Sequence, residues 1–202
     1  MRAKFVYENL EFERGGDPKS TMGIGKRALI KKWFDDLDVS SDKYTIDDNF
    51  NIRVEGSLYL ADTPITSLPD NLSVERYLDL NNTQITSLPD NLSVGGYLSL
   101  YNTPITSLPD NLSVGRFLNL RNSLITSLPD NLSIGGSLYL ADTLITSLPD
   151  NLSIGGSLDL ENTQIASLPD NLSVGGFLDL RNSQITSLPD NLKVEGKIHK
   201  NF

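Results

Sequence analysis

The stretch Ile85-Thr-Ser-Leu-Pro-Asp-Asn-Leu-Ser-Val-Gly-Gly96 recurs almost letter for letter every twenty residues. Seven copies align, and they begin near Ser57, Tyr77, Tyr97, Phe117, Ser137, Ser157 and Phe177. A partial eighth copy begins at Lys197. Self-similarity at this period is typical of a solenoid, in which each repeat forms one coil. The fixed columns are therefore expected to build the scaffold, and the changing columns to carry the function.

Alternating side chains in each copy predict a short strand with one buried face. In the second copy, Leu78 and Leu80 are apolar, while Tyr77 and Asp79 flank them. Successive side chains of a strand point to opposite faces, so the two leucines are expected to face the core. The proline and the Asp-Asn pair that follow end the strand and turn the chain back. We therefore expect one parallel, concave sheet and an extended convex side.

The fixed columns resemble the leucine-rich repeats, in particular the short twenty-residue bacterial class with a Leu-Pro dipeptide. The resemblance covers roughly residues 52–196. Where that family usually has an asparagine after the strand, this chain has a hydroxyl residue that can still bond the turn. These positions are Thr63, Thr83, Thr103, Ser123, Thr143, Thr163 and Ser183. The resemblance implies an α/β-type solenoid of mostly β and irregular structure, with one short strand per repeat on a concave face.

The first 56 residues lack the repeat and are expected to form an α+β cap, with residues 57–202 as the solenoid. Residues 4–14 read as a strand or hairpin, and residues 22–37 as an amphipathic helix. The apolar face of that helix is predicted to hold Leu29, Ile30, Trp33, Phe34 and Leu37. A solenoid needs its end coil covered, which is the simplest role for this unit. Use of the apolar helix face by a partner is the alternative.

The opening residues are also similar to those of leucine-rich-repeat proteins encoded by tailed bacteriophages. That resemblance implies synthesis in the cytoplasm of an infected bacterium, and it implies no activity. The N-terminus lacks the apolar run of a signal peptide, and no stretch approaches the length that crosses a bilayer. A cytoplasmic protein without membrane contact is therefore expected.

Charge is distributed unevenly along the chain. Residues 1–56 hold 10 Lys and Arg against 11 Asp and Glu, whereas residues 57–202 hold 7 against 15. An acidic body repels phosphate backbones, so nucleic acid is not an expected partner. The chain has no cysteine and a single histidine, His199, which leaves disulfides, thiolate chemistry and a serine-histidine triad without support. No cofactor is expected.

The changing strand columns supply the candidate binding residues. Neighbouring strands lie about 4.8 Å apart, so Tyr77, Tyr97, Phe117 and Tyr101 are expected to form one aromatic patch with Arg121 at its margin. Aromatic and arginine side chains suit protein recognition, although stacking along the ladder alone explains them equally well. The full predicted concave set is Tyr59, Tyr77, Tyr97, Tyr101, Phe117, Arg121, Tyr139 and Phe177.

Two acidic groups are weighed as chemical sites. Asp159, Glu161 and Asp179 could approach one another as paired carboxylates do in glycoside hydrolases, but no other catalytic partner is visible. A second row could bridge calcium or simply bond its own turns, and this alternative stays open. It consists of Asp70, Asp90, Asp110, Asp130, Asp150, Asp170 and Asp190. No catalytic residue and no metal ligand is assigned.

The partial eighth repeat resembles no C-terminal cap. Lys200 occupies a position where the other copies have a core leucine. An uncovered coil exposes apolar side chains and unpaired strand groups, which favours assembly. The residues expected to take part are Lys197, Ile198, Lys200 and Phe202.

The sequence thus favours a non-enzymatic module that binds a protein partner through its concave face. The alternative is a structural protein that assembles with itself, head to tail, into an oligomer or fibre.

Overall fold

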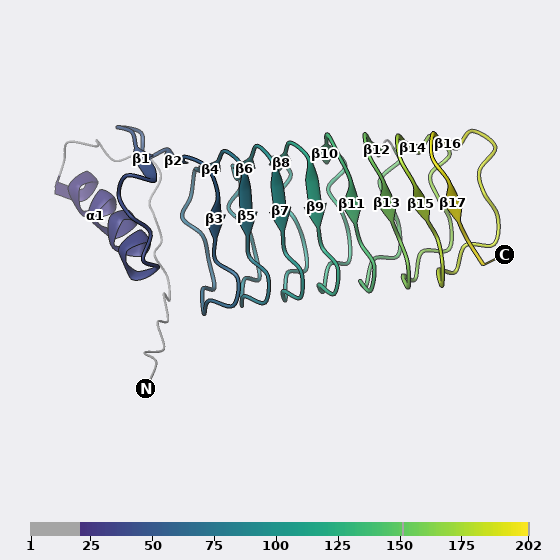
Figure 1. The fold of residues 1–202 in the computed structure, drawn as a ribbon, viewed down its shortest axis with the longest axis horizontal. Helices are drawn as coiled ribbons and strands as arrows, with labels where there is room; N and C mark the ends of the chain where they lie inside the picture. Colours follow the sequence, from purple (N-terminus) through teal and green to yellow (C-terminus); the bar gives the residue numbers. More distant parts are fainter. Residues whose placement is uncertain (1–20, 151, 202) are drawn as a thin grey trace.

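The chain forms a β-solenoid of about seven coils of roughly 20 residues, preceded by one helix and an antiparallel strand pair (Figure 1). The structure is a computed structural model that describes residues 21–150 and 152–201. The predicted strand or hairpin at residues 4–14 lies outside this range, as does Phe202. No helix of the described ranges is long and apolar enough to cross a membrane.

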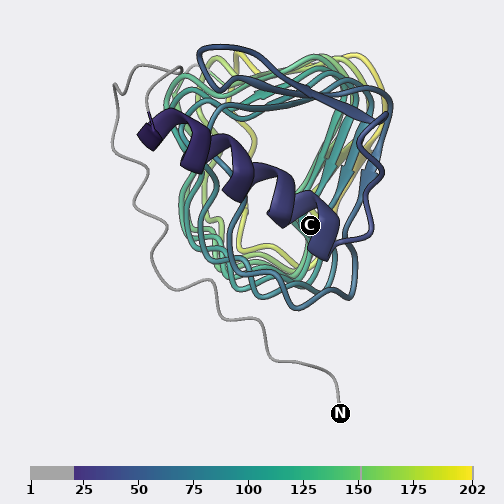
Figure 2. The same cartoon turned by 90° about the vertical axis from the view of Figure 1, so that its left-hand side faces the viewer.

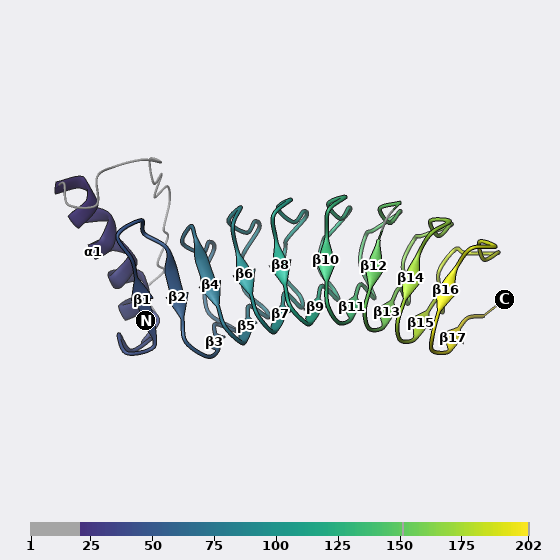
Figure 3. The ribbon, with the colours of Figure 1, turned by 90° about the horizontal axis from the view of Figure 1, so that it is seen from above.

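Two sheets run along the solenoid. The nine strands of sheet A, in spatial order, are β1 (Tyr44–Ile46), β2 (Ile52–Val54), β4 (Leu72–Val74), β6 (Ser93–Val94), β8 (Ser113–Val114), β10 (Ser133–Ile134), β12 (Ser153–Ile154), β14 (Ser173–Val174) and β16 (Lys193–Val194). The eight strands of sheet B are β3 (Leu58–Tyr59), β5 (Tyr77–Asp79), β7 (Tyr97–Ser99), β9 (Phe117–Asn119), β11 (Leu138–Tyr139), β13 (Leu158–Asp159), β15 (Leu178–Asp179) and β17 (Ile198–His199). The row of coils bends gently, with sheet B on the inner side (Figure 3).

Neighbouring coils pair in parallel, and each strand residue pairs with the residue twenty positions later in the sequence. Leu78 pairs with Leu98, and Leu98 pairs with Leu118. Each side chain therefore lies beside its own counterpart in the next coil. The β1–β2 pair is the antiparallel exception, with Tyr44 opposite Val54.

Sheet B is the predicted parallel sheet, but sheet A is an addition to the prediction of an extended side. Six of its nine strands contain the Ser-Val or Ser-Ile pair of the repeat, and in β6 Val94 is buried and Ser93 is directed outward. Two residues are too few to show alternation, which is why the repeat gave no signal for this second ladder.

The core is one continuous column of apolar side chains inside the coils. In the second copy Leu78, Leu80, Ile85 and Leu92 have no exposed surface. Figure 2 looks along this column from its N-terminal end. The alternation in the sequence therefore predicted the buried side correctly.

The turn after each of the first seven strands of sheet B, β3 to β15, is made by a residue with left-handed backbone. The residues are Asp62, Asn82, Asn102, Asn122, Asp142, Asn162 and Asn182, with φ between 54° and 59°. Asn and Asp tolerate this region better than other non-glycine residues. Their side chains also link coils, because the Asn102 amide donates to Asn82 Oδ1 at 2.8 Å and the Asn82 amide to Asp62 Oδ1 at 2.9 Å.

The hydroxyl column beside this turn bonds the backbone as predicted. The Oγ1 atoms of Thr83, Thr103 and Thr143 donate to the carbonyl three residues earlier, at 2.7 to 2.8 Å. Ser123 differs, since its buried Oγ has no hydrogen-bond partner.

The repeated glycines from Gly95 onward allow the backbones of neighbouring coils to approach closely, and they do not adopt a left-handed backbone conformation. A Cβ added to Gly115 would lie 2.1 Å from the carbonyl oxygen of Gly95 in the preceding coil. Neither residue is in the left-handed region. Glycine at these positions therefore lets the backbones of successive coils come into contact, because no side chain separates them.

The described part of the N-terminal unit, residues 21–56, covers the N-terminal end of the solenoid (Figures 1 and 2). The helix α1 (Thr21–Asp36) begins and ends one residue before the predicted 22–37. Trp33 and Phe34 are buried in the common core, and the Phe34 ring stacks on Tyr44 of β1 at 3.9 Å. The apolar face is narrower than predicted, because Leu29 is 40% exposed.

Replacing hydroxyl residues in the turn column should affect stability differently at two sites. Thr143→Val keeps the shape but leaves the Leu140 carbonyl without its hydroxyl donor, so the free energy of unfolding should fall by about 1 kcal/mol. Ser123→Ala removes an unpaired buried hydroxyl and should change stability by less than about 0.5 kcal/mol, or raise it. Urea unfolding followed by circular dichroism measures both. An equal loss in the two variants would contradict the assigned bonds.

Candidate functional site

The outward face of sheet B carries the candidate site. Because Leu78 and Leu80 fill the core, the residues that alternate with them, such as Tyr77 and Asp79, project from the sheet. The eight strands of sheet B, from β3 to β17, lie side by side in one row (Figure 1). Outward side chains of successive coils therefore meet as neighbours.

Four aromatic rings form a continuous row on this face. The centroids of Tyr77 and Tyr97 are 4.5 Å apart, and those of Tyr97 and Phe117 are also 4.5 Å apart with an angle of 10° between the rings. Tyr139 extends the row, 6.4 Å from Phe117. Since each inner ring covers the face of the next, the row offers ring edges and hydroxyls to a partner.

Arg121 joins the aromatic row to the acidic end of the sheet. Its guanidinium carbon lies 4.3 Å from the centroid of the Tyr139 ring. Its Nε also donates to Asp159 Oδ2 at 3.0 Å, and its Nη2 makes a second bond to the same oxygen. Asp159 is only 8% exposed, so the guanidinium replaces much of the water that would otherwise solvate this carboxylate.

Three carboxylates converge next to this pair. Oxygen atoms of Asp159, Glu161 and Asp179 all lie within 4.8 Å of one another. Arg181 donates to Asp179 and, at 2.9 Å, to Glu161. The predicted approach of these side chains is therefore present, with arginines bound to all three.

The surroundings of Asp179 favour its ionised form. Partial burial by itself raises the pKa of Asp179, but the hydrogen bonds and charge of Arg181 outweigh it and leave that pKa below its ordinary value. A general acid in glycoside hydrolysis needs the opposite shift. The arrangement of Asp179 and Arg181 thus suits an ion-pair network.

The calcium row stays an open prediction. Within residues 21–150 and 152–201, the one group of acidic side chains close enough to share an ion is the cluster on sheet B. The aspartates of the row from Asp70 to Asp190 do not converge in this way.

The remaining predicted binding residues lie outside the aromatic row. Tyr59 is 67% exposed at the first coil, and Phe177 is 53% exposed and stacks on His199 at 6.1 Å. Tyr101 is 38% exposed, and its hydroxyl accepts a hydrogen bond from Asn122 at 3.0 Å. The predicted patch therefore contains Tyr77, Tyr97 and Phe117 in contact, with Tyr101 turned toward the asparagine column.

Two exposed leucines were not among the predicted residues. Leu124 and Leu144 occupy the same column in adjacent coils and are 47% and 48% exposed. Other copies have Pro or Gln there. The replacement of Pro or Gln by Leu at this position of the repeat could have identified these two exposed leucines from the sequence.

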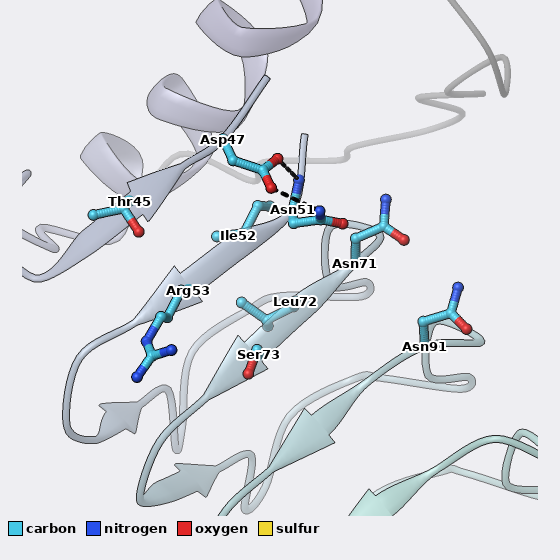
Figure 4. A pocket seen from close by; sticks show the side chains of 9 residues that line it. All are labelled: Thr45, Asp47, Asn51, Ile52, Arg53, Asn71, Leu72, Ser73 and Asn91. Carbon is cyan, nitrogen blue, oxygen red and sulfur yellow. Dashed lines mark hydrogen bonds between the residues drawn. The ribbon is translucent and has the colours of Figure 1, made fainter. Parts of the chain in front are cut away.

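A shallow hollow lies on sheet A near the cap (Figure 4). It encloses about 560 Å³ and is lined by Thr45, Asp47, Asn51, Ile52, Arg53, Asn71, Leu72, Ser73 and Asn91. Asp47 Oδ1 accepts the backbone N–H of Asn49 at 2.9 Å and of Asn51 at 2.8 Å, while its Oδ2 accepts the Asn51 amide. Asp47 therefore holds the turn between β1 and β2.

Three of the predicted assembly residues lie in the last coil, and the fourth, Phe202, lies outside the described residues. Ile198 is partly buried in β17, and Lys197 and Lys200 are exposed. Whether these ends or the sheet B face bind anything stays a prediction.

Comparison of the chain with protein-family models and with curated proteins found no match.

Removing the cation that pairs with the buried Asp159 carboxylate should destabilise the solenoid. Arg121→Ala leaves the Asp159 carboxylate without its cation, so the free energy of unfolding should fall by about 1 to 3 kcal/mol. Arg116→Ala, at an exposed position, is the matched control and should change it by less than about 0.5 kcal/mol. Urea unfolding compares the two, and equal effects would show that the bridge contributes nothing.

The Asp47 turn should make the cap sensitive to acid. The Asn51 side chain and backbone hold the pKa of Asp47 below its ordinary value, so its contribution is present at neutral pH. That contribution should be lost as the pH falls below about 4 and through the lowered pKa. Asp47→Asn should therefore weaken the cap at pH 7 and differ little from the parent in strong acid.

Trp33 is the single tryptophan and is buried in α1, so its fluorescence reports the cap. Asp48→Asn is the control, since the Asp48 side chain is 82% exposed and its 3.4 Å ion pair with Arg27 lies at the surface, where such pairs contribute little. A constant difference between Asp47→Asn and the parent at every pH would contradict the role of the carboxylate.

Proposed function

We propose that the chain is a non-enzymatic binding module that docks a protein partner on the outward face of sheet B. The observation that carries this proposal is the row from Tyr77 to Tyr139, which continues through Arg121 into the ion pair with Asp159. Aromatic and arginine side chains at the centre of a face are the residue types that dominate binding energy in protein interfaces.

The rigidity of the row supports this use. Each ring is fixed by stacking on its neighbours, and the strands below are paired in register. A surface whose side chains are already ordered loses little conformational entropy on binding. Ring edges carry positive potential, so the row suits carbonyl or carboxylate oxygens of a partner.

The family and source belong to the same proposal. The Leu-Pro dipeptide and the leucine columns support membership of the short bacterial leucine-rich repeats. The opening residues support a tailed-bacteriophage origin and action in the cytoplasm of the infected bacterium. Catalysis is not part of the proposal, because Asp159, Glu161 and Asp179 are paired with Arg121 and Arg181.

Site-specific photo-crosslinking tests the proposed face. A benzophenone amino acid at Tyr101, beside the stacked row, should capture a defined protein in bacteria that express the full chain. The same probe at Ser113, exposed on sheet A, is the control and should capture nothing defined. Identical products from both positions, or none from Tyr101, would contradict the proposal.

Removal of the row should then abolish capture. Tyr97→Ser together with Phe117→Ser removes two central rings and should lower the cross-linked yield at Tyr101 at least about tenfold. The fold should persist, because the leucine columns are untouched, and circular dichroism verifies this. Ser113→Ala with Ser133→Ala on sheet A serves as the matched pair and should leave the yield unchanged.

A further inference from the structure

The last coil is the least covered part of the described core. Leu188, Leu192, Val194 and Ile198 are only partly buried. Their counterparts one repeat earlier, Leu168, Leu172, Val174 and Leu178, are between 0% and 6% exposed. In addition, β16 and β17 each have a strand neighbour on one side only.

The opposite end of the solenoid does not present a matching open coil. There α1 packs on the core through Ile30, Trp33 and Phe34 (Figure 2). Sheet A ends in β1, which runs antiparallel to β2. A head-to-tail contact between two copies would therefore have to form on α1, while the C-terminal coil has the shape of a surface that packs on another coil.

We propose that the C-terminal coil docks on the same coil of a second copy, with two-fold symmetry. Rotation by 180° about an axis perpendicular to the solenoid brings the two ends together and reverses the strand direction. The edge strand β16 then pairs antiparallel with the β16 of the partner. The antiparallel pair β1–β2 is already the neighbour arrangement at the other edge of sheet A.

Lys193 on β16 and Glu195, the residue directly after this strand, carry the charges that specify the register of this contact. Buried faces stay aligned when Val194 lies opposite the partner's Val194. Lys193 then lies opposite the partner's Glu195, and Glu195 opposite the partner's Lys193. Both residues are exposed and project from the outer face of the sheet, so two opposite-charge pairs form across the junction. The head-to-tail fibre stays a separate prediction, because a two-fold contact closes on itself.

The oligomeric state of the full chain is the first test. Sedimentation velocity over a dilution series should show a species of twice the 22.2 kDa chain mass that dissociates to the monomer. A monomer at every concentration overturns the proposal. Longer oligomers or fibres also overturn it, and would favour the head-to-tail arrangement.

Charge exchange is the second test. Glu195→Lys or Lys193→Glu alone places like charges opposite each other twice in the dimer, and each should raise the dissociation constant about tenfold. The double exchange Lys193→Glu with Glu195→Lys restores both pairs and should return dimerisation to the parent level. Failure of the double variant to recover would overturn the register.

A control separates this contact from any general effect of charge on sheet A. Ser153→Glu adds a charge to the same face two coils away and should leave the dissociation constant unchanged. Because the variants lie at the end of sheet A, cross-linking from sheet B measures the proposed partner binding independently.

Discussion

Hydrogen bonds between the backbones of neighbouring coils hold this molecule together. Leu80 N–H donates to the carbonyl of Ser99 at 2.9 Å, and Leu100 N–H donates to that of Asn119 at 2.8 Å. One coil has too few apolar side chains to offset the entropy of ordering twenty residues, so its stability depends on the adjacent coils. This dependence explains why glycine recurs at the same positions of the repeat. Backbone hydrogen bonds between coils require the two backbones to lie in contact, and a side chain at these positions would separate them.

The same register determines the chemistry of the surface. Residues at the same position of successive repeats lie next to one another on the sheet. Three successive aromatic residues at one position therefore stack because the strands pair in register. Arg121 crosses this order, because it reaches Asp159, 38 residues further along the chain. It links the aromatic row to the acidic cluster of sheet B, and its one side chain connects three successive coils through Tyr139 and Asp159.

The sequence predicted those features that depend on local alternation and period. The leucine columns, the parallel sheet B, the hydroxyl bonds and the approximate limits of α1 follow from patterns within a single repeat or helix. Sheet A was missed, because its two-residue strands show no alternation. The asparagine column was overlooked although only Asn and Asp occupy it, which is the signature of left-handed backbone. Contacts of Arg121 and Tyr101 depend on side-chain direction across coils, which one repeat cannot specify.

The constant register also bears on how such a chain can change length. Loss or duplication of one full twenty-residue unit leaves every remaining Leu-Leu, Ser-Ser and Asn-Asn neighbour in place, and shortens or lengthens the body by about 4.8 Å. The surface, however, is rearranged at the new junction. Deletion of residues 117–136 would put Ser137 beside Tyr97, where Phe117 now stacks. A near-identical repeat can therefore keep its scaffold through recombination while its surface acquires new neighbours in a single step.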